Sequence, residues 1–379
     1  MGPHGRFVIA ARSPLLPSSL ERRSGSQWTT PVITTCSGHY ARASMRIHSL
    51  MHGRRWHPHP PAQPASFRTT TCSDNTDGQA MSKLLGDHEI HCPICGPSAT
   101  FRVKYDEDAD VENLDFAARK LTRHMHWRMV QCNECGLVYS NPIIDPEKIY
   151  HLYRETDFIV EKQLDLMGDD YIRELLAVAD PASSPRMLEV GSANGFFIAR
   201  ALAEGFDAVG VEPGEAAVAD APAEVRARIV NDVLRTGLFP PESFDIVCSF
   251  QVFDHVLDPN DFLQMIRHYL KPGGKFVQIH HDITSFLPTT LGRRASTYDV
   301  EHIHLWSPDT MRKILLQNGF TTVRIDAVSS SYQLDHVIRQ LPLPDLIKNT
   351  SRRALAVAGL SNLTLRLPVE NMRVYSLKA

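Results

Sequence analysis

The sequence predicts an α/β protein in which a small cysteine-bearing module precedes a doubly wound, mostly parallel sheet. Three observations support this prediction. The chain has 379 residues, of which 43% are hydrophobic and 22% charged, a balance typical of globular proteins with a sizeable core. From Arg186 onward, apolar runs of strand length alternate with helical stretches. Two short cysteine motifs stand ahead of them.

Residues 1–80 differ in composition from the rest of the chain. They hold nine arginines, no lysine and three acids, a net charge of +6, whereas the remainder has a net charge of −9. No sustained apolar period of 3.6 or 2 residues runs through them, so they have little with which to build a core. We expect a dispensable or spuriously translated extension, with a transit peptide or a functional arm as the alternatives.

Two copies of Cys-x-x-Cys-Gly predict a structural metal site. Each copy places two thiolates on a tight turn, and four thiolates are the ligands of a closed, tetrahedral Zn²⁺ site. Thirty-six residues separate the copies, more than the typical ribbon loop of about 15–20 residues, and we interpret the acidic stretch 106–110 as a solvated insert. We therefore predict a zinc-ribbon-like module over residues 81–145. Its ligands would be Cys92, Cys95, Cys132 and Cys135, whereas Cys248 lies in an apolar run and is assigned to the core.

The elements of the remaining chain follow from its periodicity. A helical linker is expected over 146–182, with helices around 146–154 and 159–178. The α/β domain is expected over 183–379. Its strands are predicted at Met187–Val190, Phe206–Val211, Phe244–Ser249, Lys275–Ile279 and Met372–Leu377, and its helices at Phe196–Glu204 and Asp261–Leu270.

A glycine turn after the first of these strands predicts a nucleotide site. Gly191 and Gly195 bracket the turn, and Glu212 ends the next strand about 20 residues on, where an acid accepts hydrogen bonds from both ribose hydroxyls. A dinucleotide fingerprint would need a further glycine where Ala193 stands. Glu189, just before the turn, would repel a phosphate but suits a ligand that carries an ammonium group. These features point to S-adenosylmethionine.

Residues from about 186 to 326 resemble the class I S-adenosylmethionine-dependent methyltransferase family. The front end, with Cys-x-x-Cys-Gly-Leu-Val-Tyr at 132–139, resembles a subset of that family that has an N-terminal zinc-binding module. Some members of this subset methylate sugars or occur with polysaccharide and lipid genes. The resemblance implies a seven-stranded, Rossmann-like methyltransferase sheet. The motifs that support it, in the family's order, are Glu189–Gly195, 242–247, 251–256, 270–274, 301–306 and 319–320.

The same resemblance implies a set of cofactor-binding residues. In the family, the acid that Glu212 matches binds the ribose, and Asp232 falls where the family has an acid near the adenine. The residues that we expect to bind S-adenosylmethionine are Glu189, Gly191, Ser192, Gly195, Glu212, Asp232 and Gln251.

Histidines near the carboxyl ends of the strands are the candidate catalytic residues. The sulfonium already makes the methyl group electrophilic, so the protein must align the acceptor and remove its proton. In an open α/β sheet the acceptor lies beyond the carboxyl ends of the strands, and histidine is the natural base near neutral pH. The candidates are His281, His280 and His255; His302 could instead fix a loop over the pocket.

Three hypotheses for function follow. We favour a cytoplasmic methyltransferase for a small-molecule, sugar or lipid-linked acceptor, mitochondrial only if residues 1–80 are a genuine transit peptide. The second is an RNA methyltransferase that grips nucleic acid with the basic residues around Trp127. The acidic stretch 106–110 in the same region argues against it. The third is a non-catalytic scaffold that binds S-adenosylmethionine. No apolar run approaches the roughly 18 residues of a membrane span.

Overall fold

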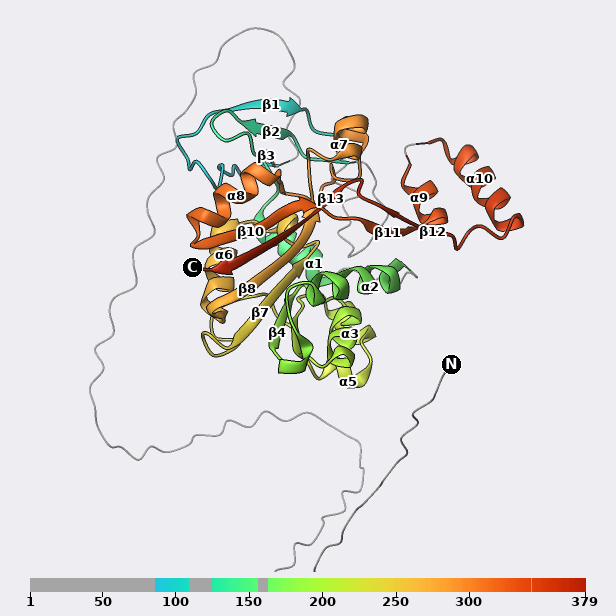
Figure 1. Ribbon diagram of the computed structural model, residues 1–379. Coiled ribbons are helices and arrows are strands. Elements are labelled where there is room, and N and C mark those ends of the chain that lie inside the picture. The colour runs from blue at the N-terminus through green and yellow to red at the C-terminus, as the bar shows by residue number, and fades with distance from the viewer. Residues whose placement is uncertain (1–85, 109–124, 156–162, 342) are drawn as a thin grey trace, which may run out of the picture. The chain divides into compact units, whose positions relative to one another are not determined.

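The computed structural model describes residues 86–108, 125–155, 163–341 and 343–379 (Figure 1). The expected extension over residues 1–80 lies outside the described residues, as does the insert beyond residue 108. Within the described part of the chain, no helix is both long and apolar enough to cross a membrane.

A seven-stranded mixed sheet forms the centre of the α/β domain, in the order β10-β13-β8-β7-β4-β5-β6. The strands β4 to β8 pair in parallel, and β13 lies antiparallel between β8 and β10. The α/β prediction is therefore confirmed. The bounds are β4 Arg186–Val190, β5 Asp207–Val211, β6 Ile229–Val230, β7 Phe244–Phe250, β8 Leu270–His281, β10 Phe320–Ala327 and β13 Asn371–Lys378.

Helices cover both faces of this sheet because its buried strands send alternate residues to opposite sides. Met187 of β4 packs in a cluster with α2 and α3, and Cys248 of β7 lies in the same cluster, as expected for a core cysteine. The next residue, Leu188, belongs to the opposite cluster with α6 and α8. The helices are α1 Pro146–Glu155, α2 Gln163–Leu176, α3 Phe196–Glu204, α4 Glu215–Asp220, α5 Ala223–Arg226, α6 Pro259–Tyr269, α7 Phe286–Leu291 and α8 Pro308–Gln317.

Each predicted strand and helix overlaps an observed one, with differences at some bounds. The helix α6 begins at Pro259, two residues before the predicted Asp261. The strand β8 begins at Leu270, because the Lys-Pro-Gly-Gly stretch expected to lead into it is itself extended. Four elements between Ala327 and β13 were not expected, since that part of the sequence has no regular apolar period. They are β11 Ser330–Gln333, α9 Leu334–Gln340, α10 Asp345–Val357 and β12 Thr364–Leu367.

The cysteine-bearing segment and the α/β domain share a second sheet. The strands β1 Phe101–Tyr105, β2 Met129–Cys132 and β3 Val138–Ser140 are joined by β9 His304–Leu305, which comes from the loop after β8. The Trp127 indole also donates a hydrogen bond of 2.8 Å to the carbonyl of Val300 in that loop. Trp127 is 1% exposed, so it is not the exposed aromatic that a nucleic-acid-gripping module would need.

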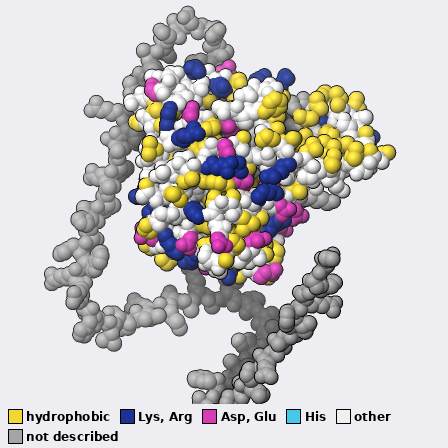
Figure 2. Space-filling model, viewed as in Figure 1, with side chains coloured by type: hydrophobic (Ala, Val, Ile, Leu, Met, Phe, Trp, Pro, Cys, Tyr) yellow, Lys and Arg dark blue, Asp and Glu magenta, His cyan; other side chains and the backbone are white. Residues whose placement is uncertain are grey.

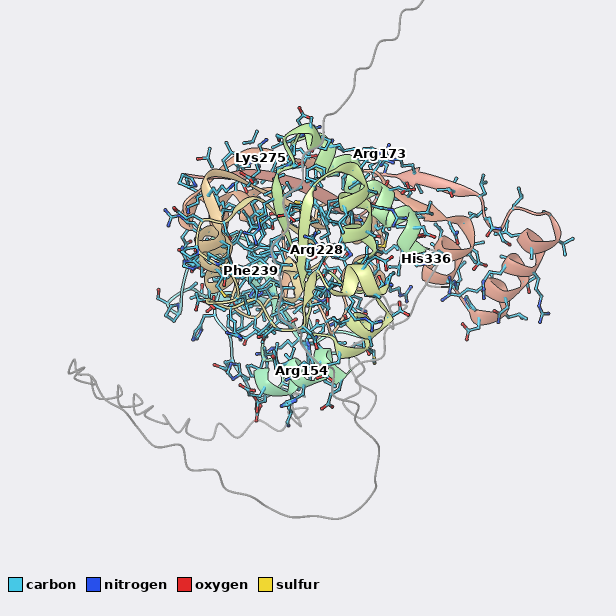
Figure 3. All side chains as sticks on the ribbon, turned by 90° about the horizontal axis from the view of Figure 1, so that it is seen from below. Arg154, Arg173, Arg228, Phe239, Lys275 and His336 are labelled. Carbon is cyan, nitrogen blue, oxygen red and sulfur yellow. The ribbon has the colours of Figure 1, made fainter. Side chains whose placement is uncertain are left out.

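The C-terminal insertion forms a lobe beside the sheet. We define the lobe as β11, α9, α10 and β12; the two strands pair antiparallel, and β11 packs against α2. In Figure 1 the red helices α9 and α10 extend sideways beyond the edge of the sheet. In Figure 3, His336 of α9 lies where the lobe meets the rest of the domain.

Candidate active site

A cavity of about 640 Å³ opens at the carboxyl ends of the central strands. Its floor includes the last residue of β4 and the residues at or just beyond the ends of β5, β7 and β8. This is where open α/β sheets bind their ligands. These floor residues are Val190, Glu212, Gln251 and His281.

The glycine turn shapes one wall of this cavity. Gly191 and Gly195 both have left-handed backbones, with φ of 77° and 73°, which glycine adopts without a steric penalty. A Cβ on Gly191 would lie 2.4 Å from a methyl carbon of Val252, another lining residue. The missing side chain at position 191 therefore keeps the cavity wall open.

The Glu212 carboxylate fastens the turn to the second strand. One oxygen accepts a hydrogen bond of 2.8 Å from the amide of Ala193, and the other accepts one of 2.8 Å from the amide of Gly214. Glu212 also lines the cavity, so a negative charge lies at its edge beside the turn. The donor and acceptor chemistry fits a ribose, and the open turn leaves room for a nucleoside beside it.

The predicted cofactor residues divide into two groups. Gly191, Glu212 and Gln251 line the cavity. The other four lie behind or beside it: Glu189, Ser192, Gly195 and Asp232.

Each member of the second group has a definite environment. Ser192 is fully buried and packs so closely on β5 that a Cβ at Gly210 would lie 2.5 Å from its hydroxyl. Glu189 is 2% exposed, on the strand beneath the turn. Asp232 accepts hydrogen bonds from the amide of Val233 and the guanidinium of Arg235. The neighbours Val233 and Leu234, rather than Asp232, face the cavity.

A buried histidine–carboxylate pair lies at the end of β8. The Nδ1 atom of His281 is 3.0 Å from Asp254 Oδ2, and the same oxygen accepts a hydrogen bond of 3.1 Å from the His281 amide. Burial alone would raise the pKa of Asp254, but the hydrogen bond from His281 and the charges of nearby histidines hold this pKa well below its usual range. Asp254 is therefore an anion that orients the imidazole, with Nδ1–H donating and Nε2 left to accept a proton.

The pair also sets the protonation of His281. Burial would lower the pKa of His281, but the hydrogen bond to Asp254 and its charge outweigh burial and raise this pKa above its ordinary value. A base whose pKa is raised toward the working pH is suited to proton abstraction.

Two further histidines and a tyrosine complete the polar cluster on the cavity wall. The His302 ring lies 4.6 Å from that of His281 and 4.8 Å from that of His255, measured between centroids. The Tyr153 hydroxyl of α1 is 2.8 Å from Nδ1 of His255. Burial, followed by the charge of His302, lowers the pKa of His255 to about 3, and burial also lowers the pKa of His302. Both rings are therefore neutral near pH 7, when they can exchange hydrogen bonds with a polar acceptor group.

His280, a candidate catalytic residue from the sequence, does not reach the cavity. It is fully buried, does not line the cavity, and its Nδ1 is 3.6 Å from Asp254 Oδ1. The reason is strand alternation: His280 and His281 are consecutive residues of β8 and point to opposite faces. Only one of the two can face a ligand, and it is His281.

Sequence reasoning missed two residues of this wall, whereas the segment after Ala327 was expected to cover part of the pocket. Asp254 lies in the 251–256 motif but was assigned no role from the sequence. Its position just beyond the end of β7 could have indicated that it lies near the site. Tyr153 lies on a helix that was interpreted as a linker. The roof comes from the C-terminal segment, where the Glu370 carboxylate accepts hydrogen bonds from the hydroxyls of Tyr332 and Ser296.

The four cysteines of the two motifs lie together at one end of the smaller sheet. Their sulfur atoms are all within 4.8 Å of one another. Gly96 and Gly136, which follow the motifs, have left-handed φ of 81° and 85° and turn the chain around the sulfurs. Among the described residues this is the one group whose ligand atoms could together hold a metal ion, and four sulfurs suit a tetrahedral Zn²⁺.

Comparisons with known proteins give sequence matches to methyltransferases. Residues 160–325 match a sequence family described as "Methyltransferase domain". The chain is 28% identical over 160 residues to the ubiquinone biosynthesis O-methyltransferase of Roseobacter denitrificans, covering 39% of this chain and 64% of that protein. It is 30% identical over 147 residues to the protein of the same name from a Bradyrhizobium species, covering 36% and 58% respectively.

Both relatives are matched over only part of their length. The chain spans about three fifths of the length of these two relatives. A solved methyltransferase from Archaeoglobus fulgidus aligns with 57% of this chain and 94% of its own, at 17% identity and a TM-score of 0.41. Residues 160–325 match a methyltransferase family, and the cavity that these residues help to line includes the glycine turn, Glu212 and His281 of the His281–Asp254 pair.

Proposed function

We propose that this chain is an enzyme that transfers the methyl group of S-adenosylmethionine to a hydroxyl of a small-molecule or lipid-linked acceptor with an apolar body. The single observation that supports this most is one cavity that joins the glycine turn and Glu212 to the His281–Asp254 pair. The first half has the chemistry to hold a nucleoside, and the second can hold a proton. Methyl transfer to oxygen needs both in one place.

The cofactor half of the proposal names its residues. Glu212 would accept hydrogen bonds from the ribose hydroxyls, and the backbone of the turn at Gly191 would lie along the nucleoside. Glu189, beneath the turn, would complement the positive charge of the amino-acid part. When bound, S-adenosylmethionine supplies an electrophilic methyl group on a sulfonium. The role of the protein is then to position the acceptor and to receive its proton.

The acceptor half follows from the rest of the wall. His281 Nε2 would take the proton of the acceptor hydroxyl, and the Asp254 anion would stabilise the resulting imidazolium. His255, His302 and Tyr153 would orient the hydroxyl. Apolar residues of the roof and of the loop after β8 would surround the remainder of the acceptor and exclude water; they include Leu287, Leu291, Val328, Val337, Leu367 and Val369.

We further propose that Cys92, Cys95, Cys132 and Cys135 hold one structural Zn²⁺. The closeness of the four sulfurs supports this, as do the two glycine-terminated turns. A site with four thiolate ligands leaves no open position, so the ion would stabilise the smaller sheet without taking part in the reaction.

A calorimetric titration of S-adenosylmethionine into the full chain tests the proposed function. We expect micromolar binding by the wild type and binding at least tenfold weaker for Glu212→Ala. Glu215→Ala is the matched control, because Glu215 is an acid three residues on whose side chain is 65% exposed and paired with Arg154. The proposal fails if the folded wild type does not bind S-adenosylmethionine, or if both variants bind it equally well.

A further inference from the structure

The helix α10 presents an unusually apolar surface for an exposed helix. It has 13 residues, and none of them is buried. Leu346 is 79% exposed and Val357 is 91% exposed. Figure 2 shows hydrophobic side chains gathered over the part of the lobe that extends from the domain. The large exposed apolar residues of this region are Leu343, Leu346, Ile347, Val357, Leu360 and Leu363.

Leu346, Ile347 and Val357 belong to α10, whereas the other three flank it; we call Leu346, Ala354 and Val357 the apolar stripe. Leu346 and Val357 are eleven residues apart, about three turns of an α-helix, so they lie on one side of α10. Ala354 and Thr350 fall between them on the same side. A helix with an apolar side that no described element covers is typical of a surface-binding helix.

Positive charge accompanies the apolar stripe. Arg353 lies seven residues after Leu346, which places it beside the stripe, and it is exposed. The Arg352 guanidinium, on another side of α10, binds the Asp335 carboxylate of α9 at 2.7 Å and so fixes the two helices to each other. Between Leu334 and Val369 the basic residues are Arg339, Lys348, Arg352, Arg353 and Arg366, and the acids are Asp335 and Asp345. The lobe is positive although the whole chain has a net charge of −3.

We propose that α10 docks the protein on an anionic lipid surface. The apolar stripe would enter the boundary between headgroups and acyl chains, and Arg353 would reach the lipid phosphates. Charge complementarity favours lipid over a second copy of this chain. Two copies paired through α10 would bring like charges together, whereas anionic headgroups would neutralise them.

The lobe that would dock is also the roof of the cavity. His336 and Val337 of α9, Tyr332 of β11 and Leu367 of β12 all line the cavity. Docking would therefore place the roof of the cavity against the membrane, where an acceptor with a lipid tail is found. This second step rests on the proposed methyl transfer; the docking itself does not.

Flotation of the full chain with extruded vesicles tests the docking. One set of vesicles is pure phosphatidylcholine, and the other contains about one part phosphatidylglycerol to three parts phosphatidylcholine. Residues 1–80 carry a net charge of +6, so the decisive comparison is between variants. Leu346→Glu removes apolar contact and adds repulsion, and we expect it to weaken binding to the anionic vesicles about tenfold or more. Leu316→Glu is the matched control, because Leu316 is 75% exposed on α8, outside the lobe.

Each outcome decides the proposal. Loss of flotation for Leu346→Glu with normal flotation for Leu316→Glu supports docking through α10, as does weaker binding to pure phosphatidylcholine. Equal flotation of the two variants, or no flotation of the wild type, overturns it. A fall in molar mass of Leu346→Glu by light scattering in the absence of vesicles would also overturn it, in favour of a second copy as the occupant. Titration with S-adenosylmethionine on the same samples reports the proposed function separately.

Discussion

Gly191→Ala probes the most sharply defined contact in the glycine turn. The backbone of Gly191 has φ of 77°, a conformation that costs an L-residue about 1–2 kcal/mol. The added Cβ would lie 2.4 Å from Cγ2 of Val252, far inside van der Waals contact. Val252 is β-branched and stiff, so it must shift or push the turn, at about 1–3 kcal/mol. We expect a total loss of about 2–5 kcal/mol in the free energy of unfolding.

Gly237→Ala separates the two contributions. Gly237 also has a left-handed φ, of 92°, but nothing lies within 4 Å of the place where its Cβ would stand. It should lose only the backbone part, about 1–2 kcal/mol. Urea unfolding followed by tryptophan fluorescence measures both losses, provided that the slope m is unchanged.

The two variants should also differ in ligand binding. The displaced Val252 lines the cavity, so Gly191→Ala should lose S-adenosylmethionine binding in a calorimetric titration, whereas Gly237→Ala should retain it. Equal destabilisation of the two variants, with binding intact in both, would refute the steric reasoning.

Four further predictions concern other parts of the molecule. In histidine NMR titrations, Asp254→Asn should lower the pKa of His281, which Asp254 holds above its ordinary value; an unmoved resonance would contradict the pairing. Folding depresses the pKa of Asp254, so the ionised carboxylate contributes to the free energy of unfolding above about pH 4, and this contribution is lost as the pH falls through the folded pKa. The stability of the wild type should therefore fall more steeply in acid than that of Asp254→Asn. The wild type should contain one zinc per chain by mass spectrometry; Cys132→Ser should lose it and Cys248→Ser should keep it, and equal contents would exclude the four-sulfur site. Trp127→Phe should lower the free energy of unfolding by about 1–3 kcal/mol in urea, since it leaves the Val300 carbonyl without its buried donor, and no change would show that the bond is unimportant.

The parts of the fold that the sequence predicted are those governed by local signals. The helix predicted at Phe196–Glu204 ends at Gly205, which has a left-handed conformation. The glycine turn and the acid after the second strand are also local, being set by spacing along one β-α-β unit. Such features need no knowledge of the tertiary fold.

The parts that could not be predicted depend on contacts between distant residues. Asp254 and His281 are 27 residues apart, and only the parallel pairing of β7 with β8 brings them together. The choice between His280 and His281 depends on strand register, and a shift of one residue would exchange their faces. The cavity roof includes β11 and β12, two short strands that pair with each other although α9 and α10 lie between them in the sequence.

The strand β9 forms a seam, by which we mean the pairing of β3 with β9, between two parts of the chain that are far apart in the sequence. If residues after 182 were produced without the preceding part of the chain, β9 would lose its partner β3 and the Ile303 carbonyl would lose its hydrogen bond from the Ser140 amide. The loop that carries His302 would then be exposed on the side that now contacts Ser140. The part of the chain up to residue 182 and the loop after β8 thus share one sheet. A chimaera that takes the first part from a distant relative should not fold unless the loop after β8 is exchanged with it. In evolution, substitutions on the two sides of this seam should be inherited together.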